Sequence, residues 1–302
     1  MLESAAKKVL ITGCAGLLGT SLIEKIALNN NVLGVFFHTE PQIGAASNIE
    51  YIKADLSEPE AVAKLIGKYQ PDAIVNSAGW VDVDGCESDR TRAEKSNFGI
   101  VKNISDTVRN SEIYLIQIST DYIFNGRGHP GKIADPPDPL NYYGQTKLLA
   151  EEYIKDHLRN YLIARTCALV GNPNRGRTNL INYFYDKLSS GQTVQAPSDL
   201  FSNPIWIDNL SELIAEAVQK KIRGVVHLGG ADYLSRFEFA QQFAEIFRFD
   251  SDLIKAVSAV SQKRPAQRPQ YAGLDITDTV PQFTARFLTV REALTAIRKR
   301  SA

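Results

Sequence analysis

The sequence predicts an α/β fold: a doubly wound parallel sheet with a smaller C-terminal lobe. Short apolar runs alternate with helical patterns, a glycine-rich loop joins the first run to the first helix, and the alternation loosens from about residue 171, where residues 172–177 form a polar loop. Apolar strands that alternate with helices are typical of parallel sheets covered on both faces. We therefore expect residues 1–170, with 205–230 returning to them, to form the large domain, and 171–204 and 231–302 to form the lobe.

Each expected element follows from a local pattern. Strands are expected where short apolar runs lie between polar turns, at residues 9–12, 32–37, 51–54, 73–76, 113–119, 161–165 and 224–228. Apolar residues at helical spacing predict helices after the glycine loop and at about 91–110, 148–157 and 290–299. Two further helices are expected to begin at capping boxes, Ser57-Glu58-Pro59-Glu60 and Ser235-Arg236-Phe237-Glu238. The phenylalanine stripe of the second is expected to pack against the sheet domain.

Composition excludes several functional classes. The chain has 302 residues, 44% of them hydrophobic, and its 34 basic and 34 acidic residues balance, so it lacks the charge for binding nucleic acid or an anionic membrane surface. Its apolar runs are all shorter than the ~20 residues of a membrane span, and no secretory signal is expected. Three cysteines without Cys-x-x-Cys spacing favour a reducing cytoplasm, and four scattered histidines predict no metal site.

A glycine-rich loop, Gly13-Cys14-Ala15-Gly16-Leu17-Leu18-Gly19, separates the first strand from the first helix. Glycines at this spacing allow a tight turn and a close approach of the backbone to a pyrophosphate, which amide groups at the helix start stabilise. We expect Gly13, Gly16, Leu17, Leu18 and Gly19 to bind a dinucleotide, in a Rossmann-type dinucleotide-binding domain. A tight glycine turn that serves only packing is the alternative.

The ends of the next two strands indicate which dinucleotide binds. A carboxylate after the second strand would suit the ribose 2′-hydroxyl of NAD, and a basic residue the 2′-phosphate of NADP. This chain has His38 there, with Glu40 close by, so NADPH is favoured and NADH stays open. Asp55 and Leu56, after the third strand, are expected beside the adenine. Asp55 has the alternative of only beginning the loop that leads to Ser57.

Tyr143 and Lys147 point to proton chemistry. Residues four apart on a helix share a face, and a nearby ammonium favours a phenolate. We therefore expect Lys147 to lower the pKa of Tyr143 from about 10 towards that of a working general acid. Ser119 and Thr120 end the fifth strand, where ligands bind in open parallel sheets. Asn97 lies on the apolar stripe of its helix; it either ties that helix to the lysine through water or is a satisfied core asparagine.

Together these motifs resemble the extended short-chain dehydrogenase/reductase superfamily. The matching features are the glycine loop, Asp55-Leu56, Asn76-Ser77-Ala78-Gly79, Asn97, Thr120 and Tyr143-x-x-x-Lys147. Within the superfamily the chain looks most like the dTDP-4-dehydrorhamnose reductases, on the stretches 83–88, 119–126, 143–148 with Glu151, Arg165-Thr166, and Arg268-Pro269 followed by Leu274-Asp275. The resemblance covers essentially the whole chain.

The resemblance implies catalytic roles for four residues. Tyr143 would protonate the C4 oxygen of a sugar as hydride arrives from the nicotinamide. Lys147 would hold the nicotinamide ribose and tune Tyr143. Thr120 would orient the carbonyl, and Asn97 would support the proton relay.

The resemblance also implies binding residues and a reaction. Ala78 and Gly79 would line the cofactor, and Asp121 and Tyr122 would bind the substrate. Arg268 would meet the nucleotide diphosphate, because a guanidinium forks well onto phosphate oxygens; a solvated loop arginine is the alternative. The implied reaction is the reduction of dTDP-4-keto-6-deoxy-L-mannose to dTDP-L-rhamnose for cell-surface polysaccharide, with NADPH or NADH. A homodimer is one assembly that the resemblance allows.

Two departures from the family leave the sugar open. The family often has a tryptophan where this chain has Ala168, and a tyrosine is more usual where it has Trp80. Two other functions also stay open. One is an epimerase or dehydratase that retains NAD, which the missing carboxylate after the second strand disfavours. The other is a non-catalytic regulatory subunit like the beta subunit of methionine adenosyltransferase, which shares the fold; the intact set of site residues disfavours it.

Overall fold

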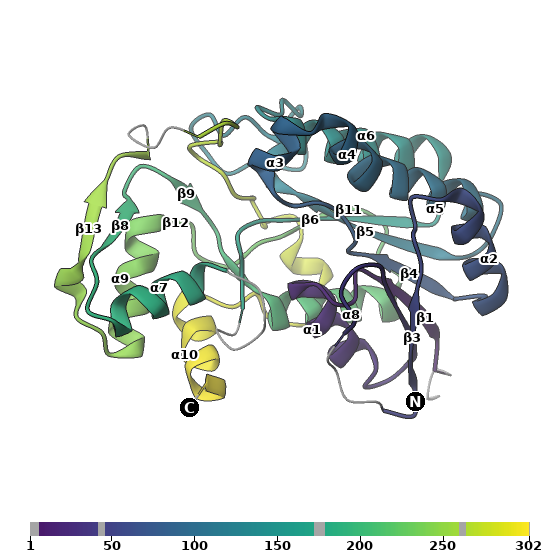
Figure 1. Ribbon diagram of the computed structural model, residues 1–302, viewed down its shortest axis with the longest axis horizontal. Helices are drawn as coiled ribbons and strands as arrows, with labels where there is room; N and C mark the ends of the chain where they lie inside the picture. The colour runs from purple at the N-terminus through teal and green to yellow at the C-terminus, as the bar shows by residue number, and fades with distance from the viewer. Residues whose placement is uncertain (1–5, 42–45, 172–178, 260–263, 302) are drawn as a thin grey trace.

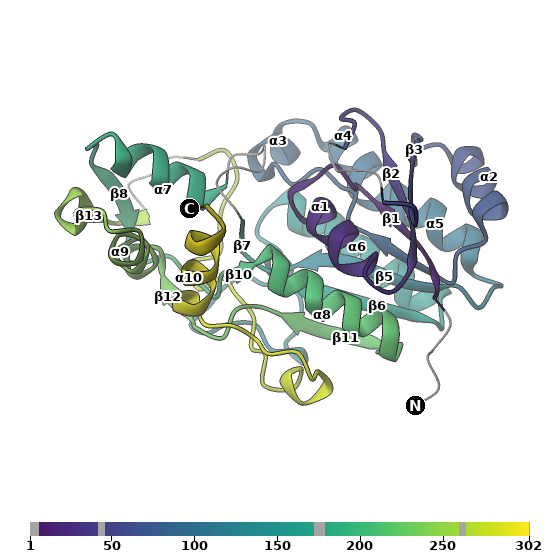
Figure 2. The same ribbon diagram turned by 90° about the horizontal axis from the view of Figure 1, so that it is seen from below.

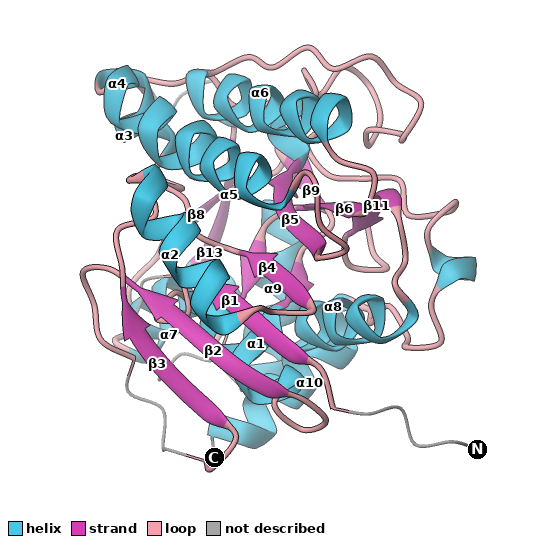
Figure 3. Ribbon diagram, turned by 90° about the vertical axis from the view of Figure 1, so that its right-hand side faces the viewer, coloured by secondary structure: helices cyan, strands magenta, loops and turns pink. Residues whose placement is uncertain are grey.

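A seven-stranded parallel sheet forms the centre of the protein, in the order β11-β6-β5-β4-β1-β2-β3 (Figure 3). The computed structural model describes residues 6–41, 46–171, 179–259 and 264–301, so the polar loop expected at 172–177 lies outside the described residues. The strands are β1 (Lys8–Thr12), β2 (Asn31–Phe36), β3 (Ile49–Lys53), β4 (Ala73–Asn76), β5 (Tyr114–Thr120), β6 (Tyr161–Thr166) and β11 (Gly224–Leu228). The strand order reverses between β1 and β4, as in a doubly wound sheet. The predicted fold class is confirmed.

Helices cover both faces of this sheet (Figure 1). The helices are α1 (Leu17–Ile26) and α8 (Ile207–Lys220) on one face, and α2 (Pro59–Tyr69), α5 (Ile100–Val108) and α6 (Tyr142–His157) on the other. Consecutive strand residues point to opposite faces, so Val9 and Ile11 join the core beneath α1 while Leu10 joins the core beneath α2. Burying one such side chain contributes about 1.5–3 kcal/mol.

A smaller lobe, on the left in Figures 1 and 2, has a core of its own. Its elements are α7 (Leu180–Ser189), α9 (Arg236–Phe247), α10 (Val290–Ser301) and the strand pair β8 (Val194–Pro197) and β13 (Ile254–Val257). Two shorter pairs are β7 (Leu169–Val170) with β10 (Ile205–Trp206), and β9 (Phe201–Ser202) with β12 (Leu234–Ser235). The phenylalanine stripe of α9 packs inside this lobe and not against the sheet as expected. Phe243 stacks on Phe247 at 4.3 Å and lies 5.7 Å from Phe184, between ring centroids.

The helix expected at 91–110 has an interruption that matters for the site. Two short helices, α3 (Val83–Ser88) and α4 (Arg90–Glu94), precede a π-helical turn at Lys95–Gly99, which continues directly into α5. A π turn rotates the following residues relative to an α-helix and is frequent at functional sites. Here the turn carries Asn97, which is buried.

One of the two predicted capping boxes is wrong and one is confirmed. Helix α2 follows Glu58, whose side chain makes no capping bond, and the Ser57 hydroxyl instead donates to Asp55 Oδ1 at 2.6 Å. The Ser235 box forms as predicted: Glu238 N donates to Ser235 Oγ at 3.1 Å, and Ser235 N donates to Glu238 Oε2 at 2.7 Å. The first box fails because the helix begins one residue later, at Pro59, and because Asp55 accepts the Ser57 N–H that the box assigns to Glu60.

Within the described ranges, no helix is long and apolar enough to cross a membrane. The same residues contain no group of three histidine, cysteine, aspartate or glutamate side chains placed to hold a metal ion. The three cysteines are buried free thiols. Burial raises the pKa of Cys14 to about 12 and that of Cys86 to about 11, so both stay protonated near neutral pH.

Candidate active site

A row of buried polar side chains crosses the carboxyl ends of three central strands. Thr12 Oγ1 donates to Asn76 Oδ1 at 2.5 Å, and Asn76 Nδ2 donates to Gln117 Oε1 at 2.7 Å. These residues end β1 and β4 and lie next to each other in the strand register, with Gln117 on β5. Ala78 N donates to Thr12 Oγ1 at 3.1 Å. The row therefore fixes the loop after β4 to the end of β1, at the point where the strand order reverses and where open α/β sheets bind ligands.

The glycine loop lies at the same point and fits a pyrophosphate. Gly13 has a φ of +65°, and a Cβ on it would lie 2.9 Å from the backbone nitrogen of Ala78. Gly16 N donates to the Gly13 carbonyl at 2.9 Å, which closes the turn. Gly16 is also the N-cap of α1, so no side chain caps the first amides, of Leu17, Leu18 and Gly19, and no acidic residue lies in the first turn. Bare amides and a positive helix terminus are suited to a phosphate anion.

The residues expected at the adenosine end lie at the ends of β2 and β3. His38 is exposed, with its ring 4.2 Å from that of Phe37. Asp55 accepts hydrogen bonds from Ser57 N and Ser57 Oγ, at 3.0 and 2.6 Å. Burial alone would raise the pKa of Asp55, but these bonds, with Lys95 and His38, hold it below its usual value. The geometry thus supports the turn role for Asp55. The Leu56 side chain is buried in the core beneath α2 and does not line this surface.

Asn97 holds the wall of the site that follows β4. Its Oδ1 accepts from Trp80 N at 2.7 Å, and its Nδ2 donates to the Trp80 carbonyl at 3.1 Å and to Thr146 Oγ1 at 3.2 Å. A Cβ on Gly79 would lie 2.9 Å from Asn97 Oδ1, so the loop has no room for a larger residue there. Asn97 therefore joins the β4 loop to α6 as a fully hydrogen-bonded buried amide, and its part in a proton relay stays a proposal.

Helix α6 brings Tyr143 and Lys147 to the end of β5. Asn141 caps the helix by accepting from Gly144 N at 2.9 Å. Lys147 is buried, and its Nζ donates to the Ile118 carbonyl at 2.6 Å. Burial lowers the pKa of Lys147 to about 8, and the Glu151 carboxylate one turn further on opposes that shift. The ammonium is therefore still charged at neutral pH, with N–H groups beyond the one given to Ile118.

The pKa of Tyr143 differs from the sequence-based expectation. Burial raises it well above the usual range of a phenol, and the Thr120 side chain acts in the opposite direction. The predicted lowering by Lys147 is wrong for this arrangement, because desolvation of the phenol dominates and the ammonium is directed to the Ile118 carbonyl. Tyr122 packs edge-on against Tyr143, with ring centroids 6.2 Å apart. The phenol is thus held in its protonated form near neutral pH.

Three consecutive residues at the end of β5, Ser119, Thr120 and Asp121, contact different parts of the protein. The Ser119 hydroxyl points to α6, where it donates to Glu151 Oε1 at 2.6 Å, so it does not face a ligand. Thr120 Oγ1 accepts from Tyr122 N and contacts Asp121 Oδ1, both at 3.2 Å. Asp121 is buried, with Oδ2 accepting from Gly273 N at 2.9 Å. Both carboxylate oxygens are thus turned to the protein, and direct substrate binding by Asp121 stays a prediction.

Sequence reasoning missed a buried charge network behind the site. Arg165 donates from Nε to Glu151 Oε1 at 3.1 Å and from Nη2 to Oε2 at 2.8 Å. Arg165 Nη1 lies 3.2 Å from His227 Nε2, and His227 Nδ1 lies 3.0 Å from the Asp275 carbonyl. Burial and Arg165 lower the pKa of His227 to about 4, so its neutral ring donates from Nδ1 and accepts at Nε2. A charged residue inside an apolar strand is the signal that would have indicated a buried partner.

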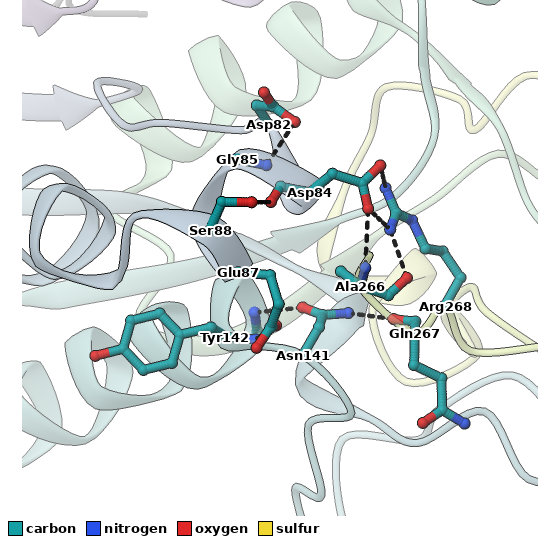
Figure 4. A network of polar contacts seen from close by, with 11 residues as sticks. Asp82, Asp84, Gly85, Glu87, Ser88, Asn141, Tyr142, Ala266, Gln267 and Arg268 are labelled. Carbon is teal, nitrogen blue, oxygen red and sulfur yellow. Dashed lines mark hydrogen bonds and ion pairs between the residues drawn. The ribbon is translucent and has the colours of Figure 1, made fainter. Parts of the chain in front are cut away.

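Arg268 has an internal partner in place of a ligand (Figure 4). It forms two bonds with Asp84 of α3, from Nη1 to Oδ1 at 2.5 Å and from Nη2 to Oδ2 at 2.9 Å. The solvated-loop alternative is therefore wrong, and contact of Arg268 with a nucleotide diphosphate stays a prediction. The same segment, residues 266–274, hereafter the strap, bonds to the start of α6, where Asn141 Nδ2 donates to the Gln267 carbonyl at 2.8 Å. Arg268 therefore fastens the strap to α3.

Fold and site together define a class: doubly wound proteins with a nucleotide-type glycine loop beside a half-buried tyrosine, a buried lysine and a buried threonine. Within this class the chain belongs to the family described as the RmlD substrate binding domain, whose model matches residues 7–302.

Named relatives agree with this family. A dTDP-4-dehydrorhamnose reductase of Shigella flexneri is 28% identical over 279 residues, covering 88% of this chain and 89% of the relative. The methionine adenosyltransferase 2 subunit beta of Mus musculus is 27% identical over 276 residues, covering 89% and 80%. Among solved structures, the dTDP-4-dehydrorhamnose reductase of Bacillus anthracis in complex with NADP has the same fold, with a TM-score of 0.84 and 22% identity over 98% of this chain and 99% of that one.

Proposed function

We propose that this protein reduces the 4-keto group of a nucleotide-linked 6-deoxy sugar, with NADPH or NADH as the reductant. One observation carries the proposal: the Lys147 ammonium is bound to the carbonyl of Ile118, and two residues further along β5 the Thr120 side chain meets the phenol of Tyr143. A hydroxyl, a phenol and an ammonium at the end of one strand suit a reaction in which an oxygen gains a proton while its carbon gains hydride.

Each residue has one task in this scheme. When bound with its pyrophosphate at the start of α1, the cofactor supplies the hydride. Tyr143 donates its phenolic proton to the carbonyl oxygen, which the Thr120 hydroxyl orients. Lys147 holds the nicotinamide ribose through its remaining N–H groups, and its charge stabilises the phenolate that Tyr143 becomes. Asn97 keeps the Trp80 wall in place.

We propose NADPH as the preferred form of the cofactor. The end of β2 presents the exposed His38 and no carboxylate in Phe36-Phe37-His38-Thr39, while the Asp55 carboxylate is engaged by Ser57. A 2′-phosphate therefore meets less negative charge here than at a site with an acidic residue. The NADP complex of the Bacillus anthracis relative is consistent with this preference. Initial rates with NADPH and NADH at matched concentrations test it, and a higher kcat/KM for NADH would contradict it.

The substrate proposed first is dTDP-4-dehydrorhamnose, on the strength of the Shigella flexneri relative and the shared family. The test is cofactor oxidation against a panel of dTDP-, GDP- and UDP-linked 4-keto sugars, followed by product analysis. Tyr143→Phe is expected to lower turnover at least a hundredfold while cofactor binding stays nearly intact, because the variant loses only the proton donor. Turnover close to wild type would remove Tyr143 from the mechanism.

A regulatory subunit is the second candidate, favoured by the similarity to the mouse methionine adenosyltransferase subunit. The raised pKa of Tyr143 is compatible with it, because an inactive protein has no need of a phenol matched to neutral pH. The discriminating experiment mixes the purified protein with the methionine adenosyltransferase of its own source and measures complex formation by size-exclusion chromatography. A stable complex together with no turnover on the sugar panel would decide for regulation.

A further inference from the structure

Asp121 is a buried carboxyl that the proposed reaction does not use directly. It follows Thr120 at the end of β5, and the residue is 4% exposed. Oδ2 accepts from Gly273 N of the strap at 2.9 Å, and Oδ1 lies 3.2 Å from Thr120 Oγ1. The carboxyl is therefore fixed between the strap and the residue that orients the carbonyl.

The Thr120 hydroxyl has one proton, which either the Asp121 carboxylate or a substrate oxygen can accept. One of its lone pairs accepts from Tyr122 N at 3.2 Å. An ionised carboxylate only accepts hydrogen bonds, so the Thr120 proton then goes to Asp121 Oδ1. A protonated Asp121 reverses that bond. Since Oδ2 already faces the Gly273 N–H, the carboxyl proton lies on Oδ1 and is donated to Thr120. The Thr120 proton is then free for another acceptor.

We propose that Asp121 is a positioning residue that acts through Thr120: only when its carboxyl is protonated does the Thr120 hydroxyl donate to the substrate carbonyl oxygen beside Tyr143. This inference rests on the proposed reductase function and adds a control to it. An ionised Asp121 also opposes the phenolate that forms when Tyr143 gives up its proton, because the two charges are alike. Both effects slow the same step when Asp121 is charged.

The surroundings of Asp121 raise its pKa towards neutral pH. Burial raises its pKa to about 6, against the hydrogen bonds from Gly273 and Thr120. The titratable groups that couple to it are Tyr143 of α6, Cys167 after β6, Tyr233 before β12 and the neighbouring Tyr122, all neutral at pH 7. The positive charges in this region, those of the three arginines 236, 264 and 268, act on Tyr122. The carboxyl therefore changes charge near neutral pH.

The experiment compares the pH profiles of turnover for wild type, Asp121→Asn and Thr120→Val. In wild type, kcat is expected to fall about tenfold between pH 5.5 and 7.5, the usual worth of one hydrogen bond, and then to level off. Asp121→Asn is isosteric: its carbonyl accepts from Gly273 and its amide donates to Thr120 at every pH, so the fall disappears and the acid-side rate is maintained. Thr120→Val is expected to lower the rate and to remove the part of the fall that depends on the Thr120 hydrogen bond, leaving only the part due to the charge of Asp121 beside Tyr143.

A measurement without substrate distinguishes failure of the Asp121 inference from failure of the proposed reductase function. A carboxyl with a raised pKa makes the native state lose stability as pH rises from about 4 to 6, so the melting temperature of wild type relative to Asp121→Asn should step down over that window. Thr120→Val should extend the step to higher pH, because the carboxylate loses a donor. An active wild type whose pH profile Asp121→Asn leaves unchanged would overturn the inference, as would a step that Thr120→Val does not move. A wild type without turnover on any 4-keto sugar, but with the shifted step, would overturn the proposed function instead.

Discussion

Replacing Arg165 by methionine tests the idea that a buried ion pair holds the sheet to α6. Arg165 is 3% exposed and Glu151 is fully buried. The substitution keeps most of the apolar stem but removes the bonds at 3.1 and 2.8 Å, which leaves the carboxylate with Ser119 at 2.6 Å and the more distant Lys155 at 3.5 Å. Removing one partner of a buried pair typically costs about 3–5 kcal/mol because the other charge stays desolvated. We expect a loss of that size in the free energy of unfolding.

Urea unfolding followed by circular dichroism measures the loss, provided the slope with denaturant stays constant. Arg291→Met is the matched control, because its pair with Glu245 lies at the surface and its removal should leave the midpoint nearly unchanged. The double variant Arg165→Met/Glu151→Leu should recover much of the lost stability, since no unpaired charge remains. A single variant within about 1 kcal/mol of wild type would refute the reasoning.

Three further predictions address the cofactor loop, the buried histidine and the strap. Gly13→Ala should weaken NADPH binding at least tenfold in a fluorescence titration, because Gly13 has a positive φ and its added Cβ would lie 2.9 Å from Ala78 N. Gly67→Ala is the control, because its added Cβ meets nothing within 4 Å. Equal affinities for the two variants would count against the pyrophosphate site. In the folded protein His227 has a pKa of about 4, so acidification from pH 6.5 to 4 protonates it mainly in the unfolded chain. The free energy of unfolding of wild type should therefore fall by up to about 3 kcal/mol more than that of His227→Gln. Identical curves of stability against pH for the two proteins would show that this histidine does not matter. Asp84→Asn should release Arg268 from its ion pair and strengthen dTDP binding about threefold in calorimetry, whereas Arg268→Met should weaken dTDP binding. Weaker binding in both variants would mean that the pair is only structural.

The parts of the fold that the sequence predicts are those with a local cause. Alternating apolar runs place the sheet strands to within a residue or two, because each strand buries side chains on both faces. The glycine loop, Thr120 and the Tyr143–Lys147 pair are likewise found from spacing and from their positions at strand and helix ends. The boundaries of the two lobes, the cytoplasmic location and a homodimer remain predictions.

What the sequence does not reveal depends on partners far along the chain. Asp84 and Arg268 are 184 positions apart, so neither is recognisable as the other's partner before the chain folds. The Ser57 capping box is lost because Asp55, two positions away, accepts the Ser57 N–H that the box assigns to Glu60. The π-helical turn around Asn97 has no local pattern of its own, because the bonds from Asn97 to Trp80 and Thr146 are tertiary. The direction of the Tyr143 pKa follows from burial and not from spacing.

The strap has a consequence for the order in which the molecule is completed. A growing chain emerges with its N-terminus first, so the strands up to β6 can pair long before residue 266 exists. The bonds of the strap to Asp84, Asn141 and Asp121 form only when residues 266–274 arrive. An incomplete chain that stops before residue 266 would thus have its sheet but lack the bonds that hold Tyr143 and Thr120 in position. We therefore expect the candidate active site to be the last part of the protein to mature.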